Sequence, residues 1–326
     1  MDLFLSVIIL CIGFVILIKG ADYLVEGAST IAKRFQISDL VIGLTIVSLG
    51  TSMPELFVNM IASSKGNTDI AIGNILGSNI ANICLILGIS SIIYPLHVKK
   101  GLGMIWKGIP LSLLSAIILG ILANDQLIDG FSHSILTRSD GYVCISFFII
   151  FMYFSFSISK NMEDIALETT ESEQSNSIVW PLIKIVIGLL GLSIGGDWIV
   201  SSAVKIASYL GMSESLTGLT IVAIGTSLPE LATSAMAAYR KNVEIAVGNV
   251  VGSNITNIFL VLGISSIIQP LPFNVQNNRD ISLCIIANLW LFISMFTGKK
   301  RSLDRWEGIV LICIYIGYIS FLIYNG

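Results

Sequence analysis

The chain has 326 residues, of which 54% are hydrophobic and 12% are charged, and its formal net charge is -3. A mean hydropathy of +0.87 is too high for the surface of a water-soluble protein. We therefore expect a polytopic membrane protein that is surrounded by lipid and has no nucleic-acid partner.

Ten apolar stretches are long enough to cross a bilayer, since one helical span needs about 20 residues. Helices are expected because every backbone polar group must be satisfied inside lipid, and the stretches are too long for barrel strands. No cleavage pattern follows the first stretch, so it is expected to remain as a span. The predicted spans of this all-α fold are 2–25, 38–63, 70–94, 103–123, 141–159, 178–203, 214–238, 245–269, 280–297 and 306–324.

The basic residues predict the orientation of the chain. With the N-terminus outside, twelve of the eighteen Lys and Arg residues fall on the cytoplasmic side and four on the outer side. The positive-inside rule therefore favours both termini outside the cytoplasm, in a plasma (inner) membrane. The twelve are Lys33, Arg34, Lys99, Lys100, Lys107, Lys160, Arg240, Lys241, Lys299, Lys300, Arg301 and Arg305.

The first and sixth spans carry similar acidic steps, Gly20-Ala21-Asp22 and Gly195-Gly196-Asp197. One interpretation is that each aspartate lies near a helix end and pairs locally, as Asp22 could with Lys19 three residues away. The other is that the two aspartates take a direct part in binding a cation.

The second and seventh spans repeat one motif. Residues 43–55 read GLTIVSLGTSMPE and residues 218–230 read GLTIVAIGTSLPE, with ten of thirteen positions identical. Residues 71–88 and 246–263 match at twelve of eighteen positions, again with an offset of 175. We expect two five-helix repeats, at 1–160 and 178–326. Because five is an odd number, the second repeat must be inverted in the membrane, as in many secondary transporters.

The motif places a helix breaker beside a carboxylate. Pro54 cannot donate a backbone hydrogen bond and clashes with the carbonyl of Gly50, so we expect the helix to open and to free carbonyl oxygens between Ser48 and Thr51. Glu55 follows Thr51 by four residues, so the two side chains share a face. The second repeat supplies the same set, namely Gly225, Thr226, Ser227, Pro229 and Glu230.

These oxygens predict a site for a hard cation. Two carboxylates with hydroxyl and carbonyl oxygens suit calcium, which takes about six to eight oxygen ligands. Soft metals would prefer histidine or cysteine, and the two histidines, His97 and His133, fall in predicted loops. The alternative for Glu55 and Glu230 is a buried structural carboxylate, protonated because desolvation disfavours its charge.

The third and eighth spans add neutral oxygens. Ser78 and Asn82 lie four residues apart on one face, and Ser253 and Asn257 repeat them. Their hydroxyl and amide oxygens suit sodium or calcium. The glycines form GxxxG pairs that let helices approach closely, namely Gly73, Gly77, Gly248 and Gly252. Interhelical hydrogen bonds and cation contact are equal alternatives for Asn74, Asn79, Asn249 and Asn254.

The segment 161–177 contains Glu163, Asp164, Glu168, Glu171 and Glu173 but no Lys or Arg. Such a composition predicts an exposed, mobile, acidic linker on the cytoplasmic side. A calcium-sensing role is the alternative, although the segment does not have the pattern of an EF-hand loop.

The two GTS-x-PE segments and the two GN-x-x-GSN segments resemble the alpha-repeats of the cation/calcium antiporter superfamily, specifically its prokaryotic sodium/calcium exchanger-like proteins. The resemblance covers essentially the whole chain. It implies ten transmembrane helices in two inverted five-helix repeats. It also implies four clustered cation sites at mid-membrane, which carry calcium and sodium as transported ions, with no cofactor and no enzymatic activity.

The resemblance also implies a set of ligands. Glu55 and Glu230 would share the calcium site with the carbonyls of Thr51 and Thr226, and Asn82 and Asn257 would border it. The flanking sodium sites would use Thr51, Ser52, Ser78 and the Ser48 carbonyl in one half, and Thr226, Ser227, Ser253 and the Ala223 carbonyl in the other.

In one position the chain departs from the family pattern. Some exchangers carry Asp where this chain has Asn257. Two carboxylates match one calcium ion in charge, but they leave the driving ion and the stoichiometry open. We expect a calcium/sodium antiporter that works by alternating access. A calcium/proton antiporter of the same fold is the nearest alternative, and a cation channel with Glu55 and Glu230 as a selectivity ring is another. An intramembrane hydrolase is a third, but neither histidine of the chain falls in a predicted span.

Overall fold

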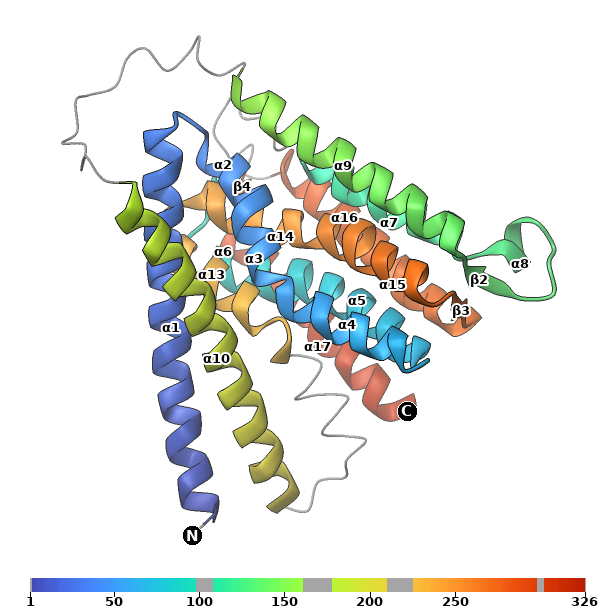
Figure 1. The fold of residues 1–326 in the computed structure, drawn as a ribbon, viewed down its shortest axis with the longest axis horizontal. Helices are drawn as coiled ribbons and strands as arrows, with labels where there is room; N and C mark the ends of the chain where they lie inside the picture. Colours follow the sequence, from blue (N-terminus) through green and yellow to red (C-terminus); the bar gives the residue numbers. More distant parts are fainter. Residues whose placement is uncertain (1, 98–107, 161–177, 210–224, 298–301, 326) are drawn as a thin grey trace.

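The computed structural model describes residues 2–97, 108–160, 178–209, 225–297 and 302–325, which are mostly helical (Figure 1). The α-helices of the first half are α1 (Asp2–Arg34), α2 (Asp39–Ile42), α3 (Ser48–Thr51), α4 (Met53–Ser64), α5 (Thr68–Ala81), α6 (Gly88–Ile93), α7 (Ile109–Leu122), α8 (Asp125–Ile128) and α9 (Arg138–Lys160). Those of the second half are α10 (Val179–Tyr209), α13 (Leu228–Tyr239), α14 (Val243–Thr256), α15 (Gly263–Ile268), α16 (Asn278–Ser294) and α17 (Arg305–Asn325).

Shorter elements join these helices. Three π-helical segments interrupt longer helices, namely η1 (Gly43–Val47), η2 (Asn82–Leu87) and η5 (Asn257–Leu262), and η6 (Val275–Asn277) is a 3₁₀ turn. Four strands are present, namely β1 (Leu96–His97), β2 (Ser134–Leu136), β3 (Leu271–Phe273) and β4 (Ser302–Leu303). The predicted linker at 161–177 lies outside the described residues.

Each predicted span overlaps helix in its described part. Fewer helices, however, are long and apolar enough to be counted as membrane spans. Five helices of the described chain are long and apolar enough to cross a membrane, and α2 to α4 would add a sixth if the bent helix is one span. Among the others, α7 has 14 residues and α13 has 12, and the parts 103–107 and 214–224 of their predicted spans lie outside the described residues. The expectation of a helical membrane protein is thus confirmed, whereas the count of ten stays a prediction.

The helices begin where local chemistry favours a start. Ser38 precedes α2 and accepts a hydrogen bond from the backbone N–H of Val41 at 3.3 Å. Asn242 does the same for α14, accepting from Ile245 at 3.1 Å. Such caps satisfy N–H groups that have no partner inside the first turn of a helix.

The equivalent helices α1 and α10 pack side by side and antiparallel (Figure 1). Glycines allow this contact, because a Cβ atom on Gly20 would lie 2.9 Å from the carbonyl oxygen of Gly188, and one on Gly195 would lie 2.9 Å from that of Gly13. Close approach of two backbones through small residues is a common way to join helices in lipid. The two helices that open the halves therefore run in opposite directions.

The rest of the molecule also joins one half to the other. α6 packs on α17, and α15 packs on α9. The two small sheets cross between the halves as well, because β1 pairs antiparallel with β4 and β2 pairs antiparallel with β3. Packing between the halves therefore forms the core around the helices that carry the repeated motifs, namely α4, α5, α13 and α14.

The GxxxG glycines of α14 pack as expected. A Cβ atom on Gly248 would lie 3.0 Å from the carbonyl oxygen of Leu40, and one on Gly252 would lie 2.6 Å from that of Leu44. Gly73 and Gly77 have no such neighbour within the described residues. Their counterparts across the pseudo-symmetry would come from 210–224, which is not described.

Candidate cation site

Glu55 and Glu230 lie in the first turns of α4 and α13, where the helices restart after a break. The helices before and after the first break meet at an angle of 45°. The serines at the two breaks have nearly equal backbone angles, with φ -82° and ψ 5° at Ser52 and φ -89° and ψ 5° at Ser227. Both glutamates are only 1% exposed. Two buried carboxylates are thus presented by equivalent turns of the two halves.

One carbonyl that we expected to be free remains engaged. The oxygen of Ser48 accepts a hydrogen bond from the backbone N–H of Ser52 at 3.0 Å, and Oγ1 of Thr51 lies 3.3 Å from it. The reason is that Pro54 removes the donor for Gly50, four residues before it, and leaves the Ser52 donor in place. Ser48 could bind a cation only through its remaining lone pair. Its counterpart, Ala223, lies outside the described residues.

The carboxylate of Glu230 is bonded across the two halves. Its Oε1 accepts a hydrogen bond from Ser52 at 3.0 Å and a longer one from Ser253 at 3.5 Å. Its Oε2 has no donor among the described residues. A serine of the first half therefore holds the glutamate of the second.

The carboxylate of Glu55 lacks the equivalent bonds. Neither of its oxygens finds a donor among the described residues. Symmetry would place Ser227 and Ser78 at Glu55, but the Ser227 hydroxyl donates to the Ser78 hydroxyl at 3.2 Å instead. Glu55 and Glu230 are close enough for their charges to repel. The predicted serines gather around both glutamates, since Ser78 also lies beside the Glu55 carboxylate, but within 3.5 Å only the Glu230 carboxylate accepts a hydrogen bond from a described side chain.

The two threonines contact asparagines of the opposite half. Thr51 donates to Oδ1 of Asn249 at 3.0 Å, and Thr226 donates to Oδ1 of Asn74 at 3.4 Å. Each hydroxyl oxygen then keeps lone pairs that a cation could use. For Asn74 and Asn249, the structure therefore contains the interhelical hydrogen bonds that were one of the two alternatives.

Sequence analysis missed the residues that hold these asparagines. The amide of Asn249 donates to Ser234 at 3.0 Å, and the amide of Asn74 donates to Asn59 at 2.8 Å. Ser234 and Asn59 occupy the same position in the two repeats, 175 residues apart. This spacing could have identified them, but the change from Asn to Ser hides the correspondence.

Asn82 and Asn257 each begin a π-helical segment, η2 and η5. Their amide nitrogens donate to Oδ1 of Asn254 at 2.9 Å and to Oδ1 of Asn79 at 3.0 Å, respectively. π-Helical turns occur frequently at functional sites. The hydropathy pattern gives no sign of them, because a single inserted residue hardly changes the helical periodicity.

Five buried carboxylate and amide oxygens find no hydrogen-bond donor in the part of the chain that the structure describes: both of Glu55, Oε2 of Glu230, and Oδ1 of Asn82 and of Asn257. Neither glutamate forms an ion pair with a described residue. Buried carboxylates without a counter-charge are costly, and a bound cation would offset that cost. The described residues contain no cluster of three or more His, Cys, Asp or Glu, so the neutral oxygens would have to complete the coordination of a hard cation.

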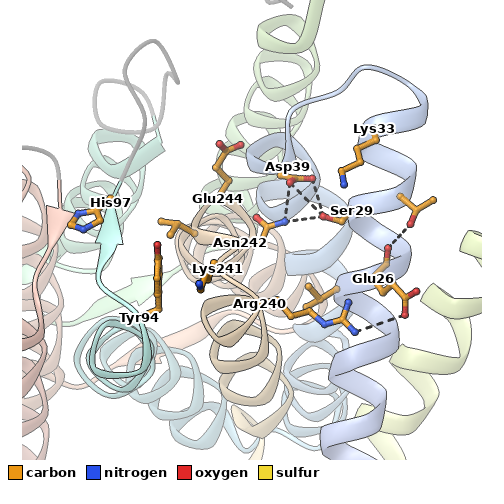
Figure 2. A pocket seen from close by; sticks show the side chains of 13 residues that line it. Glu26, Ser29, Lys33, Asp39, Tyr94, His97, Arg240, Lys241, Asn242 and Glu244 are labelled. Atoms are coloured by element: carbon orange, nitrogen blue, oxygen red, sulfur yellow. Dashed lines mark hydrogen bonds and ion pairs between the residues drawn. The ribbon is translucent and has the colours of Figure 1, made fainter. Parts of the chain in front are cut away.

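A separate cavity of about 570 Å³ lies where α1 and α2 meet the end of α13 and the start of α14 (Figure 2). None of the predicted ligands that the structure describes lines it. Asp39 in this cavity accepts hydrogen bonds from Ser29 at 3.3 Å and from Asn242 at 2.8 Å, and Glu26 pairs with Lys184 at 2.6 Å. Its acidic groups already have partners, so the glutamate site remains the better candidate.

The same region corrects one expectation. Asp22 pairs with Arg240 at 2.5 Å, so the suggested partner Lys19 is wrong. Arg240 reaches α1 because α13 ends beside it (Figure 2). The counterpart Asp197 is exposed. The structure therefore gives Asp22 the structural role of an ion pair.

Comparison with known proteins identifies the family of the chain. The family described as "Sodium/calcium exchanger protein" matches residues 5–157 and again residues 180–324. The chain belongs to this sodium/calcium exchanger family. The double match coincides with the two repeats, and it confirms the family resemblance of the motifs.

Full-length relatives of this exchanger-family chain include named transport proteins. It is 37% identical to the putative antiporter CaxA of Alkalimonas amylolytica, over 98% of this chain and 99% of that protein. It is 32% identical to the sodium/calcium exchanger MaX1 of Methanosarcina acetivorans, over 97% and 98%. A solved structure of the sodium-calcium exchanger NCX_Mj, soaked with Na⁺ and Sr²⁺, matches with a TM-score of 0.83 at 34% identity, over 98% of this chain and 99% of that one.

Proposed function

We propose that this chain is a secondary antiporter that exchanges calcium for sodium, with Glu55 and Glu230 sharing one cation pocket. The observation that supports the pocket most directly is that two buried carboxylates, one from each half, have no counter-charge among the described residues. Other buried oxygens that lack donors accompany them. The relatives named as exchangers and antiporters support the choice of calcium and sodium as the transported ions.

The pocket is proposed to use oxygen ligands from both halves. The central ion would bind the two carboxylates, and the neighbouring hydroxyl, amide and backbone oxygens would complete the flanking positions. The proposed set is Glu55, Thr51, Ser52, Ser78, Asn82 and the Ser48 carbonyl from the first half, and Glu230, Thr226, Ser227, Ser253, Asn257 and the Ala223 carbonyl from the second. The buried hydroxyls and amides around Glu230 support this set.

The proposed architecture is ten transmembrane helices in two inverted repeats, 1–160 and 178–326. The antiparallel packing of α1 on α10 supports the inversion, and so does the pairing of each small strand with a strand of the other half. The distribution of Lys and Arg favours both termini outside the cytoplasm and the linker 161–177 inside it.

Alternating access would follow from charge balance. An empty pocket holds two carboxylates in a medium of low dielectric, where their mutual repulsion and their desolvation are both costly. A pocket filled with calcium or with sodium removes that cost. Only the filled pocket can then close and reopen on the other side, so that movement of one ion requires the return of the other.

The proposal is tested by calcium uptake into proteoliposomes loaded with sodium, at fixed pH and membrane voltage. We expect uptake that depends on the internal sodium and that falls to background in Glu55→Gln and Glu230→Gln. Uptake that does not respond to sodium would contradict the exchange of calcium for sodium.

Asn257 favours one alternative enough to test it alongside. With only two carboxylates in the proposed pocket, two protons, one on Glu55 and one on Glu230, could replace one calcium ion. The same vesicles with an imposed pH gradient and no sodium gradient separate the two: calcium uptake driven by pH alone would establish the calcium/proton antiporter instead. Single-channel currents far above carrier rates would indicate a channel.

A further inference from the structure

Four buried asparagines join the two halves at the centre of the molecule. The amide nitrogen of Asn79 donates to the backbone oxygen of Asn254, and that of Asn254 donates to the backbone oxygen of Asn79, both at 3.3 Å. Asn82 and Asn257 then donate to the side-chain oxygens of Asn254 and Asn79, at 2.9 and 3.0 Å. All four are no more than 1% exposed. Each bond has a counterpart 175 residues away, so this network follows the two-fold relation of the halves.

The backbone oxygens fix the direction of every amide in this network. A carbonyl can only accept, so the nitrogen of Asn254 must point toward the oxygen of Asn79. Oδ1 of Asn254 must then point toward Asn82, which has to offer its nitrogen there. Oδ1 of Asn82 is consequently turned to the other side. The same steps, starting from the backbone oxygen of Asn254, turn Oδ1 of Asn257 away from Asn79.

The oxygens turned away in this manner are unsatisfied. Oδ1 of Asn82 and Oδ1 of Asn257 are both buried and have no donor among the described residues, like the free oxygens of Glu55 and Glu230. Leaving a buried acceptor unpaired costs free energy, and turning the Asn82 amide by 180° would not avoid that cost, because it would set the Asn82 oxygen against Oδ1 of Asn254, which is also an acceptor. The network therefore holds two acceptors in a costly orientation that a cation would relieve.

We propose that Asn79 and Asn254 are positioning residues of the cation pocket, each of which fixes the amide of a ligand in the opposite half. Asn254 orients Asn82, and Asn79 orients Asn257. The proposal gives neither positioning residue a ligand role, since the side-chain oxygen and nitrogen of each already take part in the network. This inference rests on the proposed pocket, and it assigns a role to two asparagines for which the sequence left two alternatives equal.

The role predicts a specific pattern of coupling. Removing Asn254 should release the amide of Asn82 in the other half and leave the amide of Asn257 in its own half bonded to Asn79. A residue that only packs helices together would show no preference for a partner in the opposite half. Coupling between Asn254 and Asn82 in opposite halves, without coupling between Asn254 and Asn257 in the same half, therefore distinguishes a positioning role from a packing role.

The test is a double-mutant cycle read by equilibrium binding of radioactive calcium to the purified full-length protein in detergent. Asn254→Ala should weaken calcium binding about ten-fold, the size expected from losing the alignment of one buried hydrogen-bonding group. Combined with Asn82→Ala it should add almost nothing to the effect of Asn82→Ala alone. Combined with Asn257→Ala the two effects should multiply.

The matched control is Asn288→Ala. Asn288 is also a buried asparagine bonded between the halves, since it accepts from Ser112 at 2.8 Å, but it lies on α16 outside the asparagine network. This variant should lower the unfolding temperature without changing calcium affinity by more than about two-fold, because it removes a bond of ordinary strength and no ligand. If both variants weaken binding equally, or if Asn254 and Asn82 act independently, Asn254 is a packing residue and the proposal is wrong.

The mirror cycle guards against a variant that does not fold. Asn79→Ala combined with Asn257→Ala should give the same coupling, and Asn79→Ala with Asn82→Ala should give none. Calcium binding is measured without any ion gradient, so it tests the positioning role independently of transport. A protein that binds calcium but does not respond to sodium would contradict sodium exchange, and the double-mutant cycle would still test the positioning role. Unaltered protein that binds no calcium would overturn both.

Discussion

The contacts between the halves obey two-fold symmetry at one place and break it at another. Along α1 and α10, Gly13 faces Gly195 and Gly20 faces Gly188, and an offset of 175 converts one pair into the other. At the breaks before α4 and α13 the symmetry fails: Glu230 accepts a hydrogen bond from Ser52 at 3.0 Å, whereas Glu55 has no donor within the described part of the chain. Nearly identical sequences thus take different local arrangements where the carboxylates lie.

This difference distinguishes the fixed backbone packing of α1 on α10 from the polar side chains at the glutamates, which can change their hydrogen-bond partners. The glycine contacts are fixed by backbone atoms, which cannot be rearranged without separating the helices. A serine hydroxyl can exchange one acceptor for another by rotating about a single bond. A transporter that alternates between two states would repeat its packing in both halves and let its polar contacts differ. The reverse arrangement, with Ser227 on Glu55, is what we would expect of the opposite state.

The largest effect tests whether the two carboxylates are equivalent in charge despite their unequal hydrogen bonds. Glu55→Gln and Glu230→Gln should each weaken calcium binding more than about 100-fold, because removing one partner of a buried charge interaction costs about 3–5 kcal/mol. Equilibrium calcium binding measures it, with Glu244→Gln as the control from the separate cavity. Near-normal affinity in either variant would show that the glutamates do not share one pocket.

The next effect tests the symmetric region. Gly20→Ala should lower the free energy of unfolding by about 1–3 kcal/mol, because its Cβ would lie 2.8 Å from the backbone nitrogen of Leu192. Gly195→Ala should match it. Gly196→Ala is the control, since a Cβ there meets nothing within 4 Å among the described residues, and it should be neutral or slightly stabilising. Thermal unfolding in detergent measures all three, and unequal effects at Gly20 and Gly195 would break the symmetry of the seam.

The third effect tests the asymmetric region. Ser52→Ala should weaken calcium binding about ten-fold, because a hydrogen bond to a charged group contributes about 1.5–3 kcal/mol. Ser227→Ala removes only a bond to Ser78 at 3.2 Å and should weaken binding less. Calcium titrations of the two variants under one set of conditions make the comparison. Equal losses of affinity would mean that Ser52 and Ser227 contribute equally to calcium binding. The two hydrogen-bond arrangements would then interconvert faster than calcium binds.

Much of this could be predicted from sequence because the decisive features are repeated. The offset of 175 identified both helix breaks and both sets of oxygen side chains, and Pro54 explains its break by local chemistry alone. The direction of each hydroxyl and amide could not be predicted, because it depends on what the opposite half places within 3 Å. Ser227 and Ser52 are identical in sequence context and still choose different acceptors.

The π-helical turns and the partner of Asp22 escaped prediction for a similar reason. A π-turn at Asn82 leaves the apolar pattern unchanged, so only the folded backbone reveals it. Lys19 was the nearest cation in sequence to Asp22, but Arg240 is the one that packing brings there. Local spacing predicts contacts within one helix, and it contains no information about which helix of the other half lies alongside.

The smallest effect concerns a second break in symmetry, at the ends of α4 and α13. Arg240 pairs with Asp22, but the equivalent residues Lys65 and Asp197 form no ion pair within the described chain. Side chains exposed by 35% and 26% give a pair worth only about 0.2–1 kcal/mol, so Arg240→Gln should change the ratio of the two transport states by no more than about five-fold.

Calcium affinities measured separately from the two faces of the reconstituted protein report this ratio. Arg240→Gln should change the ratio of the two affinities. Raised salt should make the ratio of unaltered protein more like that of Arg240→Gln, because salt screens exposed ion pairs. Lys65→Gln is the matched control and should leave both affinities unchanged. If Lys65→Gln shifts the affinities as much as Arg240→Gln does, Lys65 and Arg240 each form an ion pair in one of the two transport states, and the pair of Asp22 with Arg240 belongs to one of those states.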